Sequence, residues 1–211
     1  HERLVGSEMC IRDSSYIFDD FTKKQLDTFT RVAAELEAGL EYKVIKHILN
    51  SAGIERFTDY QMDMVRLGIG LYGVSASGQK GLRNISTLKT TILQIQNVPA
   101  GDSIGYSRMS YVKRDSRIAI IPIGYADGLD RHFSNGGGEV VINGHRCPII
   151  GNICMDACMI DVTDTDAHEG DTVIIFGEEL PVSELSDKLK TIPYEILTSI
   201  SPRVKRVYYR E

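Results

Sequence analysis

The spacing of apolar residues changes near residue 82, and this change constrains the fold more than any other feature of the sequence. Before it, apolar residues recur at helical spacing from Phe18 to Leu36, and Gly39 is expected to end that helix. A short strand is predicted over 42–49, a short helix in the fifties, and a buried strand with one charge over 64–73. This alternation of strand and helix is typical of a parallel sheet or barrel.

After residue 82, short apolar runs alternate with turn signals. The pair Asn143-Gly144 lies between two apolar runs and predicts a type I′ hairpin, because that turn needs positive φ at both central positions. Ser183 is expected to cap a short helix. The other predicted elements are strands over 153–162 and 172–176, that helix over 181–191, and an alternating tail over 196–209.

These patterns divide the chain into two expected domains, 1–82 and 83–211. A complete (β/α)8 barrel needs about 250 residues, so residues 1–82 can supply only the end of one. The remaining barrel units are expected to precede His1, and the chain is interpreted as a piece of a longer protein. The predicted fold class is therefore α/β, the end of a TIM-type barrel, followed by a mostly antiparallel β domain that resembles a barrel.

The composition excludes several classes of function. The 211 residues carry 24 Lys and Arg against 29 Asp and Glu, a net charge of −5, so a nucleic-acid partner is not expected. The sequence contains no run of 18 apolar residues, so no membrane span is predicted, and no signal peptide is recognised. The cysteines lack the spacing of a zinc site, so no metal is predicted and free buried thiols in a reducing cytoplasm are expected. They are Cys10, Cys147, Cys154 and Cys158, of which the last two are predicted to share one face of a strand.

Arg66 is the first candidate site residue, because it interrupts an apolar run. A buried charge is costly unless it is paired or functional, so a structural ion pair and an anion site are both open readings. Gly68 follows two residues later, and Ser51 lies in the small polar loop that ends the preceding strand. Glycine amides and a hydroxyl at the same end of a barrel favour a cofactor that carries an anion.

Tyr106 is the second candidate, in the run Ile104-Gly105-Tyr106-Ser107 at the end of a strand pattern. A tyrosine there can simply pack its ring, or it can transfer a proton. Other polar positions have plain structural readings: Asp127-Gly128 as a turn, Met155 as core, and Asp156 as a turn cap. His47 is interpreted as a structural histidine with satisfied hydrogen bonds.

Five motifs together resemble the C-terminal part of alanine racemase, an enzyme with a pyridoxal-phosphate fold of type III. The resemblance covers most of the chain, from about Phe18 to Tyr209. The motifs are His47–Ala52, Asp63–Gly73, Ile104–Ser107, Ile123–Gly128 and Gly151–Asp156.

The resemblance implies roles for individual residues. Tyr106 falls on the tyrosine that acts as one of two catalytic bases, and Arg66 falls on the arginine that binds the pyridine nitrogen of pyridoxal 5′-phosphate. Three residues fall on positions that bind the cofactor phosphate: Ser51, Gly68 and Ile69. Three others fall on positions near the substrate: Met155, its neighbour Asp156, and Tyr125 at the entrance.

The activity implied is the interconversion of L-alanine and D-alanine by a tyrosine and a lysine, which supplies D-alanine for cell-wall peptidoglycan. It also implies a cytoplasmic homodimer in which Tyr106 acts on the partner's cofactor. The Schiff-base lysine is not matched in this chain, so the chain alone is expected to be inactive. Pro202 stands where the family often has a phosphate-binding tyrosine, and residues 9–15 match nothing.

Two other functions stay open from the sequence. The first is an amino-acid decarboxylase of the same fold, although such enzymes generally pair the pyridine nitrogen with a carboxylate, and Arg66 argues against that. The second is a fragment that only binds or dimerises, which would fit the absence of the lysine.

Overall fold

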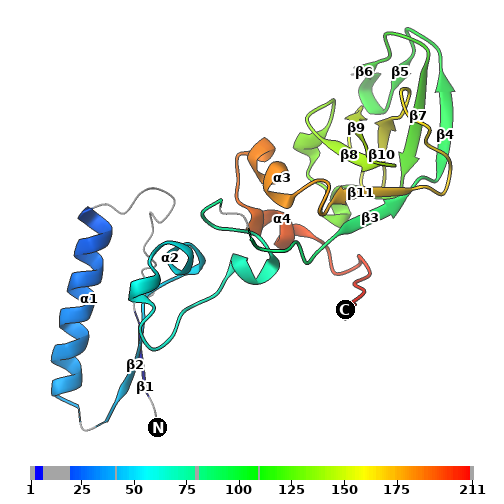
Figure 1. Ribbon diagram of the computed structural model, residues 1–211. Helices are drawn as coiled ribbons and strands as arrows, with labels where there is room; N and C mark the ends of the chain where they lie inside the picture. Colours follow the sequence, from blue (N-terminus) through cyan, green and yellow to red (C-terminus); the bar gives the residue numbers. More distant parts are fainter. Residues whose placement is uncertain (1–2, 7–19, 41, 79–80, 109, 210–211) are drawn as a thin grey trace. The chain divides into compact units, whose positions relative to one another are not determined.

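The computed structural model describes residues 3–6, 20–40, 42–78, 81–108 and 110–209. It divides into two compact units, His1–Arg83 and Asn84–Glu211, and each unit is described by itself (Figure 1). Among the helices within those ranges, none is both long enough and apolar enough to cross a membrane.

The first unit contains a parallel pair of strands with a helix between them in sequence. β1 (Arg3–Gly6) pairs with β2 (Val44–His47), and α1 (Asp20–Ala38) connects them. Gly39 follows the last residue of α1, as its position predicted, whereas Phe18 lies outside the described residues. The core of the unit consists of buried Leu26 of α1 together with Ile48, Leu49 and Phe57.

The strand predicted over 64–73 is wrong. This segment is a loop that ends in the 3-10 helix η2 (Ile69–Tyr72). Its main chain meets β2 where the Met64 N–H donates to Lys46 O (3.3 Å), and it meets the segment after β2 where the Arg66 N–H donates to Leu49 O (3.0 Å). Its glycines break the extended conformation: Gly68 has φ −108° and ψ −106°, and Gly73 has φ 76°. An apolar run alone does not distinguish a strand from such a loop.

The short helix predicted in the fifties is present as α2 (Ser51–Arg56). Asn50 caps it, because its side-chain oxygen accepts a hydrogen bond from the Gly53 N–H at 3.0 Å. The 3-10 helix η1 (Thr58–Tyr60) follows.

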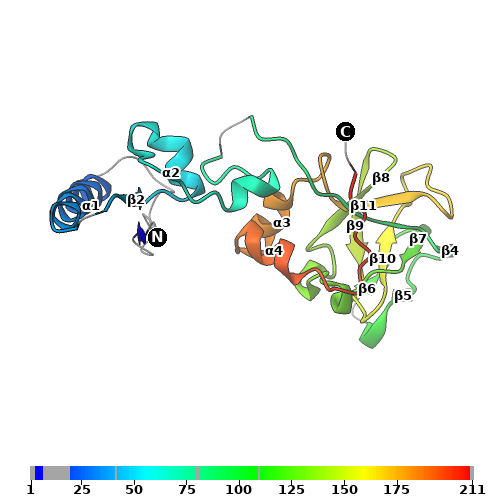
Figure 2. The same cartoon turned by 90° about the horizontal axis from the view of Figure 1, so that it is seen from below.

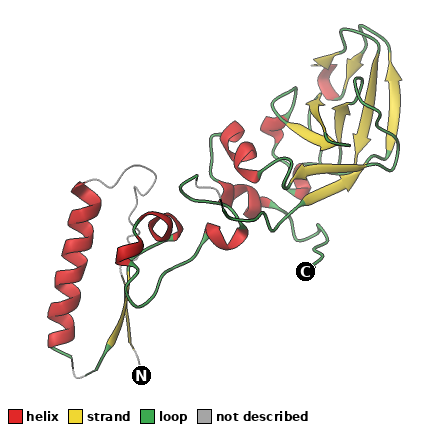
Figure 3. Ribbon diagram, in the orientation of Figure 1, coloured by secondary structure: helices red, strands yellow, loops and turns green. Residues whose placement is uncertain are grey.

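The second unit is built on a seven-stranded antiparallel sheet with the order β3-β11-β8-β9-β10-β7-β4 (Figure 3). A separate two-stranded ribbon, β5 (Ser103–Ile104) with β6 (Ser110–Tyr111), precedes β7. The strands of the large sheet are β3 (Leu88–Thr91), β4 (Gln94–Val98), β7 (Ser116–Ile121), β8 (Glu139–Ile142), β9 (His145–Ile150), β10 (Cys158–Asp161) and β11 (Thr172–Phe176).

The hairpin between β8 and β9 forms as predicted. Asn143 and Gly144 have φ of 49° and 77°, and the flanking residues Ile142 and His145 pair across the turn. Both central residues therefore adopt the left-handed conformation that a type I′ turn requires. The strand expected over 153–162 is shorter, because only β10 pairs, and Cys154 lies in the loop before it rather than on the face of Cys158.

Two helices, rather than one, lie beside each other at one end of the sheet in Figures 1 and 2. α3 (Val182–Leu189) begins after Pro181 without a side-chain cap, so Ser183 lies inside the helix and the predicted cap is wrong. α4 (Pro193–Ser199) replaces the first part of the predicted strand-like tail. Pro193 fixes φ for the first helical turn, and the Thr198 hydroxyl donates to Tyr194 O (2.8 Å), so local bonds favour a helix there.

Candidate functional site

The predicted phosphate-binding residues of the first unit come together around one hydroxyl. Ser51 begins α2 and is buried, and its Oγ accepts hydrogen bonds from the N–H groups of Gly68 (2.8 Å) and Gly70 (3.3 Å). Ile69 lies between these glycines and is also buried. Main-chain N–H groups that converge on one point form the kind of cradle that holds a phosphate. Gly70 was not predicted, although its spacing from Gly68 was visible in the sequence.

The fit of this cradle to a phosphate depends on the space beside Gly70. A Cβ at Gly70 would lie 2.9 Å from Leu67 Cδ1 and 3.7 Å from Ser51 Oγ, so a side chain there would crowd the hydroxyl. A hydroxyl and two N–H donors, with room kept open by a glycine, match the chemistry of a phosphate group. The donor set of the first unit therefore fits the phosphate end of pyridoxal phosphate.

Arg66 lies on the loop that leads to this cradle. Its Nη2 donates to Ile48 O at 3.2 Å, so its side chain crosses the end of β2. His47 is next to Ile48 in sequence and is 6% exposed, and neither ring nitrogen has a hydrogen-bond partner among the described residues. Burial, and then the charge of Arg66, lower the pKa of His47. The interpretation of His47 as a histidine with satisfied hydrogen bonds is therefore wrong.

A cavity of about 590 Å³ in the second unit contains all four predicted residues of that unit. Tyr106, Tyr125, Met155 and Asp156 line it. Sequence reasoning did not single out the other residues that line it, which are Arg131, Asn152, Ile153, Cys154 and Ala157. Asn152, Ile153 and Cys154 belong to the motif Gly151–Asp156, so that motif was the signal available for them.

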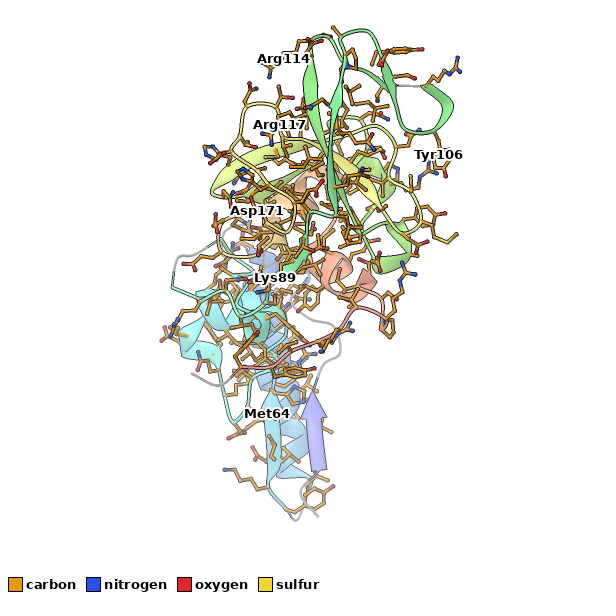
Figure 4. All side chains as sticks on the ribbon, turned by 90° about the vertical axis from the view of Figure 1, so that its right-hand side faces the viewer. Met64, Lys89, Tyr106, Arg114, Arg117 and Asp171 are labelled. Atoms are coloured by element: carbon orange, nitrogen blue, oxygen red, sulfur yellow. The ribbon has the colours of Figure 1, made fainter. Side chains whose placement is uncertain are left out.

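Tyr106 opens the short 3-10 helix η3 (Tyr106–Arg108) after β5, and this residue is 72% exposed. Figure 4 shows this side chain on the outside of the second unit, away from the strands of the sheet. Gly105 turns the chain with φ 73°, close to the Asn152 amide. The Asn152 Nδ2 donates to Tyr106 O at 3.4 Å, which joins the tyrosine segment to the opposite wall.

The other walls of the cavity are joined by main-chain hydrogen bonds. The N–H groups of Tyr125 and Ala126 donate to the carbonyls of Cys154 and Met155, both at 3.0 Å. Gly124 permits this approach, because a Cβ there would lie 2.3 Å from Cys154 O and 2.4 Å from Met155 O. Met155 is 54% exposed, so its interpretation as core is wrong.

The turn that carries Tyr125 is held by its own aspartate. The 3-10 helix η4 (Tyr125–Asp127) ends at Gly128, whose φ is 109°, so the turn predicted at Asp127-Gly128 forms. The Asp127 carboxylate accepts the Gly124 N–H at 2.9 Å. Burial would raise the pKa of Asp127, but hydrogen bonds from Arg203 and the Gly124 N–H, with the charge of Arg203, lower it.

The cysteines do not form a metal or redox centre within the part of the chain that the structure describes. Cys147 and Cys158 are buried free thiols, Cys154 is a half-buried free thiol, and Cys10 lies outside the described residues. Burial raises the pKa of Cys147 to about 11 and that of Cys158 to about 12. No group of three or more His, Cys, Asp or Glu side chains that could hold a metal occurs among those residues.

Comparisons with known proteins find the same family over both units of the chain. The family model for the alanine racemase N-terminal domain matches residues 7–76, and that for the C-terminal domain matches residues 85–208. Alanine racemase 1 of Caldanaerobacter subterraneus subsp. tengcongensis is 42% identical over 90% of this chain and 51% of its own length. Alanine racemase of Clostridium tetani is 40% identical over 90% of this chain and 52% of its own length. The chain thus spans about half the length of the relatives that it matches.

Solved structures give the same result. Alanine racemase from Bartonella henselae, described with covalently bound pyridoxal phosphate, has a TM-score of 0.85 and is 37% identical, covering 98% of this chain and 56% of its own. Alanine racemase from Bacillus anthracis with bound L-Ala-P has a TM-score of 0.87 and is 31% identical, covering 100% of this chain and 55% of its own. The predicted fold class, an α/β barrel segment followed by an antiparallel β domain, is therefore confirmed.

Proposed function

Because the chain belongs to the alanine racemase family, we propose that the full-length protein interconverts L-alanine and D-alanine with pyridoxal 5′-phosphate. The observation that carries the proposal is the cavity that places Tyr106, Tyr125, Met155 and Asp156 together. We further propose that the protein is a cytoplasmic homodimer and that its product serves cell-wall peptidoglycan.

The first unit would hold the cofactor. Ser51, Gly68 and Ile69, with the Gly70 N–H, would bind its phosphate, since their donors already converge. Arg66 would donate to the pyridine nitrogen. An arginine does not readily give up its proton, so the ring nitrogen would stay unprotonated. The bound cofactor supplies the electron-withdrawing ring that acidifies the α-proton of an amino acid.

The second unit would supply one base and part of the substrate site. The Tyr106 hydroxyl would take or return the α-proton on one face, and a lysine outside this chain would serve the other face. The cavity wall at Met155 suits a substrate carboxylate for a geometric reason. The Cys154 carbonyl accepts from the Tyr125 N–H, and the N–H of the same trans peptide, that of Met155, points the opposite way. Tyr125 would line the entrance.

The proposal is tested by replacing Tyr106 with phenylalanine in the full-length protein loaded with pyridoxal phosphate. We expect racemisation to fall about 10²- to 10⁴-fold, the usual contribution of a general base. Exchange of the α-proton with deuterated solvent should be lost mainly for one enantiomer, because one of the two faces keeps its base. Tyr111→Phe is the matched control, since Tyr111 is also an exposed tyrosine and lies on β6, the strand that pairs with β5 just before Tyr106. Unchanged exchange in Tyr106→Phe would show that Tyr106 is not the base.

The same variant tests the shared site of the homodimer. Mixing Tyr106→Phe with an Arg66→Glu variant should form mixed dimers that contain one site with neither substitution. Random mixing should then restore about a quarter of the wild-type activity, because half of the dimers are mixed and each has one intact site. If Tyr106 serves the cofactor of its own subunit, mixing restores nothing.

A further inference from the structure

Arg203 connects two walls of the Tyr106 cavity from a third segment of the chain. It lies in the tail after α4. Its Nε donates to Asp127 Oδ1 and its Nη2 donates to Asp156 Oδ1, both at 2.7 Å. Asp127 belongs to the Tyr125 turn, and Asp156 lines the cavity next to Met155. One guanidinium thus holds the two segments that the main-chain bonds of Tyr125 and Ala126 also join.

The tail that carries Arg203 is itself held in place. The Ser201 N–H donates to Asp127 O at 3.0 Å, and Pro202 restricts the backbone immediately before Arg203. Gly128 packs against the end of α4, where a Cβ would lie 2.5 Å from Ser199 O. The Arg206 guanidinium donates to the carbonyls of the tail turn, including Ile200 O at 3.0 Å. The backbone that carries Arg203 is therefore anchored by contacts other than its two ion pairs.

The two aspartates differ in their surroundings. The Asp127 side chain is 14% exposed and also accepts the Gly124 N–H, whereas the Asp156 side chain is 63% exposed. No other hydrogen bond to the Asp156 carboxylate is found within the described part of the chain. Asp127 thus has a second support for its position, but the Asp156 carboxylate depends on Arg203. Without Arg203, a mobile negative charge would lie at the wall of a cavity that must admit the carboxylate of an amino acid.

We propose that Arg203 is a positioning residue for substrate binding: it holds the Asp156 carboxylate away from the substrate carboxylate and neutralises its charge. This inference rests on the proposed function, because it assumes an amino-acid substrate in the Tyr106 cavity. Arg203 does not line the cavity, so it acts through Asp156.

Arg146 provides a matched control elsewhere in the same unit. It also bridges two carboxylates, Glu139 (2.6 Å) and Glu184 (2.6 Å), and its side chain is 43% exposed against 46% for Arg203. This pair of ion pairs joins β8 and β9 to α3, and none of its residues lines the Tyr106 cavity. Replacing Arg146 therefore removes the same type of interaction without affecting the cavity.

The experiment compares Arg203→Gln with Arg146→Gln in the full-length protein loaded with pyridoxal phosphate. We expect Arg203→Gln to raise KM for alanine roughly tenfold, the scale of one lost charge-assisted hydrogen bond, with a much smaller change in kcat. The increase should shrink at high salt, because the carboxylate is exposed and salt screens its charge. Arg146→Gln should leave KM and its salt dependence at the wild-type values.

A double-mutant cycle tests whether Arg203 acts through Asp156. In an Asp156→Asn background, Arg203→Gln should have little further effect on KM, because the charge that it would release is already gone. An equal increase in both backgrounds would overturn the proposal, since Arg203 would then act through Asp127 or through packing. If Arg203→Gln lowers the melting temperature more than Arg146→Gln does, Arg203→Lys is used in the cycle, since it keeps the charge but not the two-sided bond. Absence of racemisation in the wild-type protein would instead contradict the proposed function.

Discussion

In the unit Asn84–Glu211 the walls of the candidate site are joined by main-chain hydrogen bonds, whereas in the unit His1–Arg83 glycine amides converge on one serine hydroxyl. The cavity of the second unit is formed by the fold itself. The two N–H donors of the first unit are held by a single side-chain oxygen, that of Ser51. The geometry of the site in the second unit thus depends on main-chain contacts, and that of the site in the first unit depends on one hydroxyl.

Both units have a core of fully buried apolar side chains, which in the first unit includes Leu26 and Leu49. The sheet of the second unit encloses fully buried side chains such as Val140, Ile142 and Ile160. The two sites therefore differ in the bonds that hold them rather than in whether their units have a core, so substitutions in the two units should differ in kind.

The largest effect is expected at Gly124. Gly124→Ala would place a methyl group within 2.5 Å of the Cys154 and Met155 carbonyls, so the Tyr125 turn must separate from the opposite wall. We expect a loss of about 3 kcal/mol in the free energy of unfolding, as for other overpacked sites, and loss of racemisation. Denaturant unfolding measures the first effect, and a racemisation assay of the full-length protein measures the second.

Gly39→Ala in the first unit is the control for that substitution. A Cβ at Gly39 would meet only ordinary contacts, the nearest at 3.6 Å, so the stability change should stay within about 0.5 kcal/mol. Equal destabilisation by the two alanines would show that the close approach of the walls at Gly124 does not determine the cavity.

A smaller and more specific effect is expected at Ser51. Ser51→Ala removes the acceptor for the Gly68 and Gly70 N–H groups, so the cofactor-free protein should lose about 1–2 kcal/mol of stability. Bound phosphate would satisfy the same donors, so saturating pyridoxal phosphate should recover part of this loss. Thermal unfolding with and without the cofactor measures both values. Thr58→Ala, which removes an exposed hydroxyl of the same unit, should show neither effect.

Local rules in the sequence predicted some elements well. The turn at Asn143-Gly144 follows from backbone preference alone, because both residues adopt positive φ readily. The strand at 172–176 is a short apolar run bounded by turn residues, and β11 has those bounds. In both cases, a few neighbouring residues contain all the information that the element requires.

Other features depend on contacts that no local pattern contains. The run over 64–73 is as apolar as a strand, but Gly68 and Gly73 adopt conformations that no strand allows. Arg203 contacts Asp127 and Asp156, which lie 76 and 47 positions before it, so its role follows only from the way the tail returns to the cavity. Roles implied by the resemblance, such as that of Tyr106 as a base, stay predictions until the variants are measured.

The smallest effect concerns pH and again separates the two units. His47 has a pKa below 6.5 when folded, because burial and then the charge of Arg66 disfavour its protonation. Its contribution to stability is therefore present above about pH 6.5 and is lost as the pH falls through that value toward the folded pKa. Asp127 has a pKa below 3.8 in the fold, so its contribution is present above that value and is lost only as the pH falls through the lower, folded pKa.

Lowering the pH from 8 to 5 should thus weaken amide-exchange protection of β2 and leave that of the Tyr125 turn unchanged, which hydrogen-exchange mass spectrometry can resolve by segment. His47→Gln should flatten the pH dependence of β2, because the side chain no longer titrates. His145→Gln is the control, since His145 is exposed on β9. If both segments lose protection together between pH 8 and 5, a shared transition rather than His47 governs the response, and the first unit is not the weaker of the two in acid.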